Sequence, residues 1–149
     1  MVSCYLKMKI KIQKIKDVKI PSYAHIGDAG VDLYSAEDYS LELMERKLIS
    51  TGIKIAVPDG YEAQIRPKSG LAVKHGISIV NTPGTIDSCY RGEVGVIVIN
   101  LGDKDFVVKK GTKIAQMVLN KVEKIEFEEV KELDNTKRGE GGFGSTGPD

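Results

Sequence analysis

Tryptophan is absent from this sequence of 149 residues, which also has only two cysteines and two histidines. Cys4 and Cys89 allow at most one disulfide and match no zinc-ligand spacing, so neither a disulfide framework nor a zinc-stapled fold is expected. No apolar run reaches the roughly 18 residues that a membrane span needs. The Lys/Ile-rich first 20 residues lack the uninterrupted apolar stretch of a signal peptide. We therefore expect no membrane partner and a reducing, cytoplasmic environment.

An excess of one charge is also missing, because 22 Lys and Arg residues against 21 Asp and Glu residues leave a net charge of +1. This balance creates no field that would draw the chain to nucleic acid, so no nucleic-acid partner is expected. A local cluster of cations could still hold a small anion. The length and the 41% hydrophobic content fit one globular domain that buries a core without staples.

The sequence does contain short stretches in which apolar residues recur at every second position, the pattern of a strand with one wet face. These stretches are residues 8–13, 53–57 and 61–66, and residues 106–108 and 114–130 are also strand-like. Pro58-Asp59-Gly60 separates the second stretch from the third and predicts a turn that joins them in a hairpin. Residues 94–101 are apolar on both faces and rich in β-branched side chains, which predicts a central, buried strand.

Helix is scarce in this pattern. Residues 69–74 predict one short helix, with Ser69 as its N-cap and Gly76 as its left-handed stop. Many short strands separated by Gly, Pro and Asp turns predict an all-β sandwich or barrel over residues 1–134. From residue 135 to 149 the composition becomes glycine-rich, which predicts a mobile C-terminal arm.

The segment Arg66-Pro67-Lys68-Ser69-Gly70 suits a phosphate group. The start of a helix points free backbone N–H groups outward and favours negative charge, Gly70 allows a close approach, and the two cations add attraction. The alternative is an ordinary helix cap flanked by solvated cations, because short motifs of this kind often occur by chance.

A second segment, Gly84 to Glu93, combines an acid and an aromatic residue in a tight turn beside an apolar strand. Asp87 follows what looks like a strand edge, where a fixed carboxylate could orient or deprotonate water. Tyr90 offers a flat ring that could pack against a sugar. The alternative is an Asx turn that closes a hairpin, with Tyr90 on its rim.

The glycine-rich tail contains the pattern G-x-G-x-x-G at residues 139–144. A dinucleotide-binding motif also needs a strand before this pattern and a helix after it, and the tail has neither. It offers N–H groups for anions, Arg138 for phosphate and Phe143 for stacking on a base. The alternative is a disordered tail. Two further fragments place Asp32 after a glycine, which by itself suits a turn, and Gln116 opposite Ala115 on a strand.

Five fragments in this order resemble the five motifs of the trimeric dUTP pyrophosphatases (dUTPases). They are A-G-V-D-L-Y-S, R-P-K-S-G-L-A, G-T-I-D-S-C-Y-R-G-E, K-G-T-K-I-A-Q and R-G-E-G-G-F-G-S-T-G, and together they run from residue 29 to 147. The resemblance implies a jelly-roll-like β sandwich or distorted barrel and a homotrimer with shared sites. It also implies hydrolysis of dUTP to dUMP and pyrophosphate with Mg²⁺, and an arm that closes over the nucleotide.

The resemblance also implies roles for particular residues. Asp87 activates the water that attacks the α-phosphorus, and Tyr90 packs under the deoxyribose and leaves no room for a 2′-hydroxyl. A hairpin from Asn81 to Gly95 pairs with uracil and rejects a 5-methyl group. No protein side chain is expected to bind Mg²⁺ directly, and Asp32 contacts the ion through water. The substrate-binding residues are then Lys68, Ser69, Gly70, Asn81, Thr85, Ile86, Asp87, Tyr90, Gly95, Gln116, Arg138, Phe143 and Gly144.

Three residues depart from the family pattern. Lys68 and Lys110 stand where arginine is usual, and lysine keeps the charge but loses the bidentate fork. Cys89 stands where an aspartate is usual, so we expect Asp87 to be the only acting acid, beside an oxidation-sensitive thiol if that thiol is exposed.

Two other functions stay open from the sequence: a dCTP deaminase or bifunctional deaminase–diphosphatase of the same fold, and a non-catalytic nucleotide-sensing module. The intact Asp87, Ser69 and Gln116 count against the sensing module, and the arm with Phe143 counts against the deaminase. The expected location is cytoplasmic, with a nuclear setting or a viral origin left open.

Overall fold

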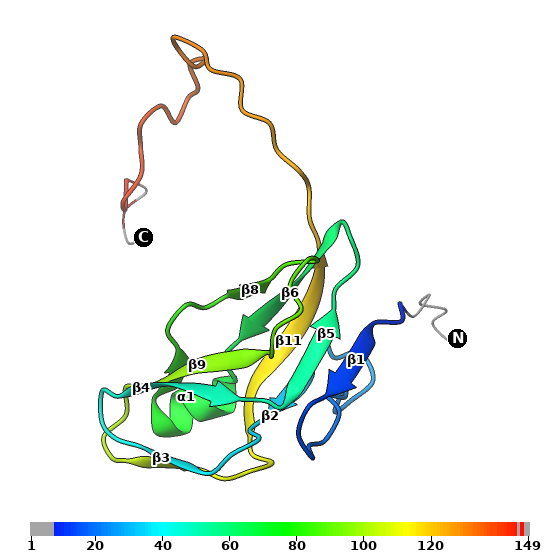
Figure 1. The fold of residues 1–149 in the computed structure, drawn as a ribbon. Helices are drawn as coiled ribbons and strands as arrows, with labels where there is room; N and C mark the ends of the chain where they lie inside the picture. Colours follow the sequence, from blue (N-terminus) through cyan, green and yellow to red (C-terminus); the bar gives the residue numbers. More distant parts are fainter. Residues whose placement is uncertain (1–7, 146, 148–149) are drawn as a thin grey trace.

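The computed structural model describes residues 8–145 and 147, and strands make up most of its regular structure (Figure 1). Residues 1–7, with Cys4, and residues 146, 148 and 149 lie outside the described part. In chain order the elements are β1 (Lys11–Lys14), β2 (Val31–Tyr34), β3 (Tyr39–Leu41), β4 (Arg46–Ser50), β5 (Ile53–Ala56), β6 (Tyr61–Arg66), α1 (Ser69–His75), β7 (Ile77–Ile79), β8 (Gly84–Ile86), β9 (Gly95–Asn100), β10 (Phe106–Val108) and β11 (Lys113–Lys121).

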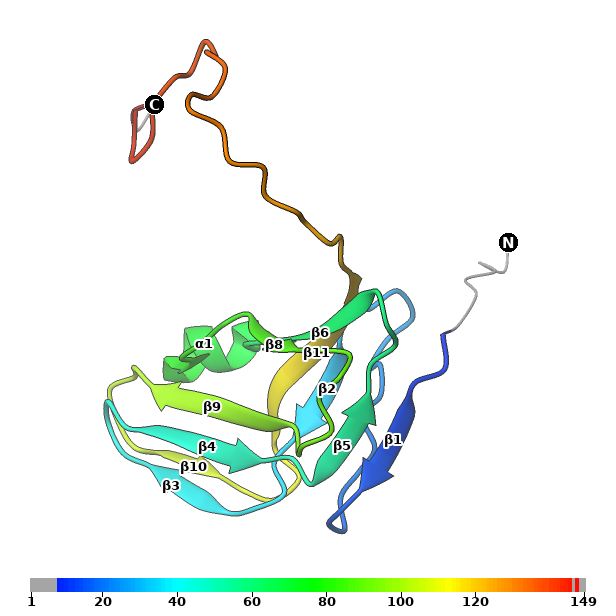
Figure 2. The ribbon, with the colours of Figure 1, turned by 45° about the horizontal axis from the view of Figure 1, so that its top comes forward.

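The strands pair antiparallel in small sheets that pack face to face (Figure 2). One sheet has the order β2-β11-β6-β8 and another the order β4-β9-β7, and the pairs β1-β5 and β3-β10 complete the body. The described strands form no closed barrel. The expected all-β, jelly-roll-like architecture with one short helix is confirmed.

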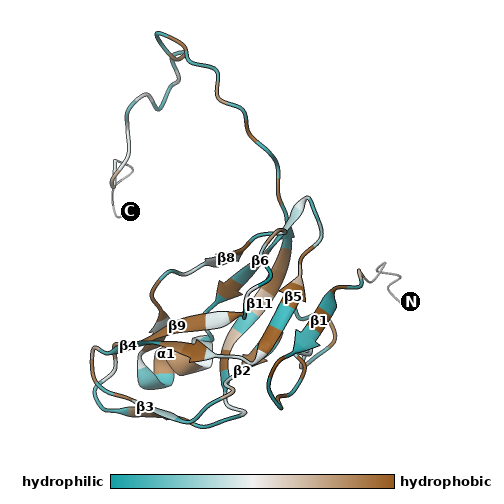
Figure 3. Ribbon diagram, in the orientation of Figure 1, coloured by the Kyte–Doolittle hydropathy of each residue, from teal (hydrophilic) through white to brown (hydrophobic). Residues whose placement is uncertain are grey.

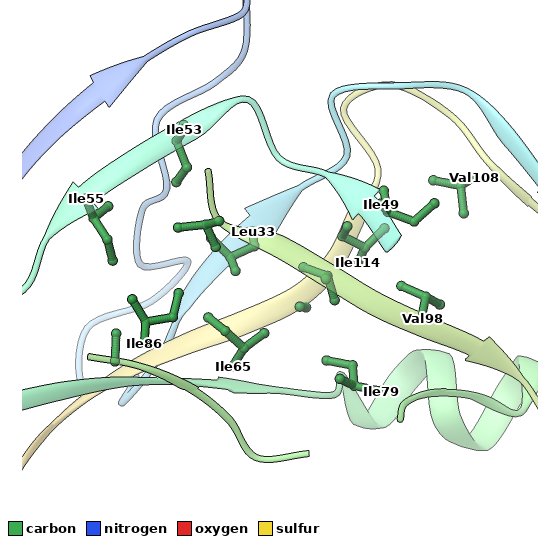
Figure 4. Packing of buried hydrophobic residues seen from close by; sticks show 14 of the residues in the cluster. Leu33, Ile49, Ile53, Ile55, Ile65, Ile79, Ile86, Val98, Val108 and Ile114 are labelled. Atoms are coloured by element: carbon green, nitrogen blue, oxygen red, sulfur yellow. The ribbon is translucent and has the colours of Figure 1, made fainter. Parts of the chain in front are cut away.

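The core lies between these sheets, and Figure 4 shows side chains from several strands pointing into the same space. Leu33 of β2, Ile49 of β4 and Ile65 of β6 are buried there with other aliphatic residues. β9 lies between β4 and β7, as a central strand should, and Val96 and Val98 are buried while Ile97 and Ile99 are half-buried. Hydrophobic residues follow β9 in Figure 3, whereas β1 is largely hydrophilic.

The hairpin expected around Pro58-Asp59-Gly60 is wrong, although the chain does turn there, with the Tyr61 amide donating to the Pro58 carbonyl at 3.2 Å. β5 pairs with β1, and β6 pairs with β11 on one edge and β8 on the other. Because both edges of β6 are taken, β5 cannot pair with it, and the turn links two sheets instead.

The strand expected to continue to residue 130 ends at Lys121, so the prediction of a strand over residues 122–130 is wrong. Lys121 is opposite Tyr61, the first residue of β6, and the Val122 amide makes a last bond to the Gly60 carbonyl at 2.9 Å. Beyond that point the described chain offers no partner strand, and the segment runs out from the body as an extended line (Figure 1). The expected boundary at residue 135 falls within this line and stays a prediction.

The helix α1 forms where expected, but Lys68 is its N-cap and Ser69 its first helical residue. Lys68 is extended and supplies no side-chain cap, and its carbonyl accepts from the amides of Leu71 and Ala72 at 3.0 Å each. Gly76 ends the helix at φ 66°, the left-handed conformation that glycine adopts without penalty. In the described chain no helix is long and apolar enough to cross a membrane.

Candidate active site

The loop into α1 places Lys68, Ser69 and Gly70 at one end of the four-stranded sheet. Ser69 and Gly70 are exposed, and a Cβ added at Gly70 would meet no atom within 4 Å, so a ligand can approach the backbone there. The Lys68 ammonium donates to Asp32 Oδ1, on the first strand of the same sheet. The Ser69 hydroxyl is not used as a cap, which leaves it available to a bound group.

Asp32 is the buried anchor of this region. Its side chain is 8% exposed, and its second oxygen, Oδ2, lies 2.6 Å from the Lys113 ammonium. Burial alone would raise the pKa of Asp32, but the hydrogen bonds and charges of Lys113 and Lys68 outweigh burial and hold the pKa below its ordinary value. Asp32 is therefore an ionised carboxylate that holds two lysines at the entrance to α1.

Strand register brings three polar residues into one row. Gln116 of β11 is opposite Asp32 on one side and Arg66 on the other, and directly opposite residues share a face of the sheet. Gln116 Nε2 donates to the Pro67 carbonyl at 2.9 Å, directly before Lys68. Arg66 is held by Gln64, whose Oε1 accepts from Arg66 Nη2 at 2.7 Å. Three strands and a loop thus supply one cationic, amide-rich surface of the kind that phosphate groups bind.

A small cavity of about 60 Å³ lies between β8 and β9. Its lining includes Asn81, Thr85, Ile86 and Gly95, four of the expected substrate-binding residues, all within the segment expected to pair with uracil. The hairpin expected from Asn81 to Gly95 is wrong, because β8 pairs with β6 while β9 pairs with β4 and β7. β8 and β9 belong to different sheets, and the cavity lies between them.

Asp87 and Tyr90 begin the loop that connects β8 to β9. The Asp87 carboxylate is exposed and forms no hydrogen bond or ion pair within residues 8–145 and 147, so it can bind water. The Asp87 carbonyl accepts from the Tyr90 amide at 3.1 Å, and the Tyr90 hydroxyl donates to the Glu93 carbonyl at 3.0 Å. The Asx turn, the alternative interpretation of this segment, does not form: a backbone turn takes its place and leaves the carboxylate free.

The arm residues Arg138, Phe143 and Gly144 are not brought to this surface within one chain. Figures 1 and 2 both show the segment after β11 extending away from the sheets. The Arg138 guanidinium Nε donates to the Gly141 carbonyl at 2.7 Å, within the arm itself, and the Phe143 ring is fully exposed.

Sequence reasoning assigned no role to Lys113 and Glu93. Lys113 reaches Asp32 because β11 shifts register between Lys113 and Ala115, and a shift of this kind leaves no signal in residue spacing. Glu93 accepts hydrogen bonds from a turn 41 residues earlier in the chain, which no local pattern shows. The Cys89 thiol is exposed, as its possible oxidation would require.

Comparisons with known proteins agree with this geometry. The dUTPase family model matches residues 16–147. A deoxyuridine 5'-triphosphate nucleotidohydrolase of Clostridium novyi (strain NT) is 59% identical over 141 residues, which cover 94% of this chain and 99% of that protein. A protein of the same name from Clostridium kluyveri is 56% identical, with the same coverage of both chains.

Solved structures give the same result. A mutant dUTPase of Staphylococcus bacteriophage 80alpha, solved with dUpNHpp, has a TM-score of 0.88 at 26% identity and covers 95% of this chain and 99% of its own. The fold and the site thus define a nucleotide hydrolase on a jelly-roll-like β fold. The chain belongs to the dUTPase family, because the family model spans most of its length and relatives above 50% identity span nearly all of it.

Proposed function

We propose that this chain hydrolyses dUTP to dUMP and pyrophosphate with Asp87 as the residue that activates water. The cavity between β8 and β9 carries the proposal, because residues singled out for the base line it and the free carboxylate of Asp87 follows directly after β8. A water held by Asp87 would attack the α-phosphorus and give its proton to the carboxylate. The bond from the α-phosphorus to the bridging oxygen breaks, and pyrophosphate leaves.

The triphosphate is proposed to lie against Lys68, Ser69, Gly70 and Gln116. Phosphoryl transfer needs mainly positioning and charge stabilisation from the protein. The half-buried Lys68 ammonium, the free N–H groups at the start of α1 and the Gln116 amide offer both. Arg138 and Phe143 would complete the site from the arm, over the γ-phosphate and the base, with Gly144 beside them.

On the nucleoside side, Tyr90 is proposed to pack under the deoxyribose and to exclude a 2′-hydroxyl. Asn81, Thr85, Ile86 and Gly95 would hold uracil in the cavity and reject a 5-methyl group. Support comes from the topology, since Tyr90 lies in the connection between β8 and β9, and both of these strands line the cavity.

Mg²⁺ is proposed as the cofactor, carried on the triphosphate, because this ion prefers phosphate oxygens and water to an all-protein cage. When bound, it would neutralise charge on the phosphates. The residues here suit a metal that arrives with the nucleotide, since both oxygens of Asp32 already accept from lysines. Asp32 would contact metal-bound water only by loosening one of those pairs.

A homotrimer with shared sites is also proposed. The arm that holds Arg138 and Phe143 extends from its own body, and residues 123–134 expose apolar side chains, including Ile125 (75%), Phe127 (88%) and Leu133 (84%). Exposed apolar side chains on an extended segment favour burial against another copy. The cytoplasmic location expected from the sequence stays a prediction.

A nucleotide panel tests the proposal. Pyrophosphate release should be fast with dUTP and at least about 100-fold slower with UTP and dTTP, because steric exclusion acts on both the sugar and the base. Ammonia release from dCTP would instead support the deaminase, which the comparisons do not favour. Binding of dUTP without pyrophosphate release would contradict the proposal and support the sensing module.

A further inference from the structure

The loop that follows Asp87 is fastened to the body by one carboxylate. Glu93 Oε1 accepts from the Ser50 hydroxyl and from the Gly52 amide, the latter at 2.8 Å. The Ser50 hydroxyl in turn accepts from the Lys16 ammonium at 2.7 Å. Glu93 therefore joins the end of the loop to the turn between β4 and β5, which also contacts the segment after β1 through Lys16.

The backbone of the same residue holds the tyrosine ring. The Glu93 carbonyl accepts from the Tyr90 hydroxyl at 3.0 Å. A Cβ added at Gly92 would lie 2.2 Å from the Tyr90 hydroxyl oxygen, so the ring lies tightly over Gly92. The side chain of Glu93 thus fixes the segment on which Tyr90 rests, and its carbonyl fixes the hydroxyl end of the ring.

Charge reinforces this attachment. Burial alone would raise the pKa of Glu93, but the Ser50 and Gly52 hydrogen bonds and the nearby charges of Lys16 and Lys54 lower it. The carboxylate is ionised at neutral pH, and hydrogen bonds to an ionised acceptor are about twice as strong as neutral ones. Removing this carboxylate costs more than removing an ordinary surface contact.

We propose that Glu93 is a positioning residue that sets the sugar selectivity of the site. This inference rests on the proposed function, in which the Tyr90 ring excludes a 2′-hydroxyl. Steric exclusion works only if the ring cannot give way, because a ring that moves aside would make room for the hydroxyl. Glu93 touches no substrate in this account and acts through the segment beneath Tyr90.

The test compares the kcat/KM values of dUTP, UTP and dTTP for Glu93→Ala and Glu93→Gln. The Ala variant should lower the dUTP-to-UTP ratio about tenfold, the size expected for loss of hydrogen bonds to a charged group. The dUTP-to-dTTP ratio should stay the same, because different residues line the base cavity. The Gln variant should keep most of the sugar selectivity, since its amide oxygen can still accept from Ser50 and Gly52.

Glu45→Ala is the matched control. Glu45 also braces a turn, by accepting from the Tyr39 hydroxyl and from the Glu42 amide at 2.8 Å, but it lies between β3 and β4 rather than in the loop after Asp87. Its selectivity ratios should equal those of the wild type. If Glu93→Ala does not fold, Ser50→Ala removes one of the two donors to Glu93, together with the acceptor of Lys16, and should lower the dUTP-to-UTP ratio about threefold.

An equal fall in kcat/KM for all three nucleotides in Glu93→Ala would overturn the inference, because it would show a general structural role. An unchanged dUTP-to-UTP ratio would overturn it as well. Failure of the proposed function is a separate result, visible in the wild type as no preference for dUTP over UTP.

Discussion

The loop from Asp87 to Val94 and the arm from residue 135 onward both supply site residues, but they are held in different ways. The loop is bonded to the body: the Val94 amide donates to the Ile53 carbonyl at 2.9 Å, and the Thr51 hydroxyl donates to the Val94 carbonyl. The described arm residues bond only among themselves, as in the 3.0 Å bond from the Ser145 amide to the Gly142 carbonyl.

This difference divides the work of the site. A loop that is already ordered loses little entropy when the nucleotide binds, so it can discriminate the sugar and the base by shape. An arm without contacts to the body must be ordered by the ligand, which costs about 1–2 kcal/mol of backbone entropy per fixed residue. Once the ligand has ordered the arm, the side chains of the arm contact the triphosphate and the base.

The largest effect is expected from the loop. Asp87→Asn keeps the size of the side chain and should lower kcat by about 10²–10⁴-fold, the usual range for a positioned acid or base. Binding of a non-hydrolysable dUTP analogue, measured by calorimetry, should change little. Near-normal turnover would show that Asp87 does not activate the water.

The arm is tested next by deleting Lys137 to Asp149. The body should keep its fold and its oligomeric state, which light scattering measures, because the arm makes no described contact with the body. Turnover should fall at least about 100-fold, since a site left open to water loses positioning of the triphosphate. An unchanged kcat would remove the arm from the mechanism and break the contrast with the loop.

A smaller effect is expected at the buried anchor, where Asp32→Asn replaces an ionised acceptor with a neutral one. The free energy of unfolding in urea should fall by about 2 kcal/mol at neutral pH, the value of hydrogen bonds to a charged group. The folded-state pKa of Asp32 lies below its ordinary value of 3.8, so the carboxylate stabilises the fold above about pH 4 and less as the pH falls through the folded pKa.

The difference between the wild type and Asp32→Asn should therefore shrink in acid, while the sugar and base selectivities stay unchanged. A difference that does not depend on pH would contradict the assignment of an ionised Asp32 held by Lys68 and Lys113.

The smallest effect is expected from Lys68→Arg, which restores the bidentate fork at the start of α1. Arginine keeps the charge facing Asp32 and can bind a phosphate through two N–H groups. KM for dUTP should fall about two- to threefold with little change in kcat, as measured by initial rates. A rise in KM would show that the Asp32 pair depends on the shape of the lysine.

The sequence predicted the parts that depend on local residues. β9 and α1 follow from their own side chains, and the family resemblance named Asn81 and Thr85, which line the cavity, as substrate-binding residues. It did not predict which strands pair, because β5 and β6 are both good strands and only the rest of the chain decides their partners. The strand-like residues after Lys121 predicted that the strand continues, but a strand also needs a neighbouring strand as its hydrogen-bond partner.

The contacts of Lys113 and Glu93 were beyond reach for a related reason. Each depends on two distant segments meeting with a particular register or turn, as β11 and β2 do at the irregularity near Lys113. Motif spacing along a single sequence contains no information about such pairings.

Amide hydrogen exchange, measured with and without the non-hydrolysable analogue dUpNHpp, tests most directly whether the nucleoside half of the site is built in advance and the arm is added by binding. Amides of residues 136–145 should exchange freely in the chain alone and at least about tenfold more slowly with the analogue, whereas the Val94 amide should be protected in both conditions. An arm that exchanges equally fast at saturating analogue, or a Val94 amide that gains protection only on binding, would contradict this account.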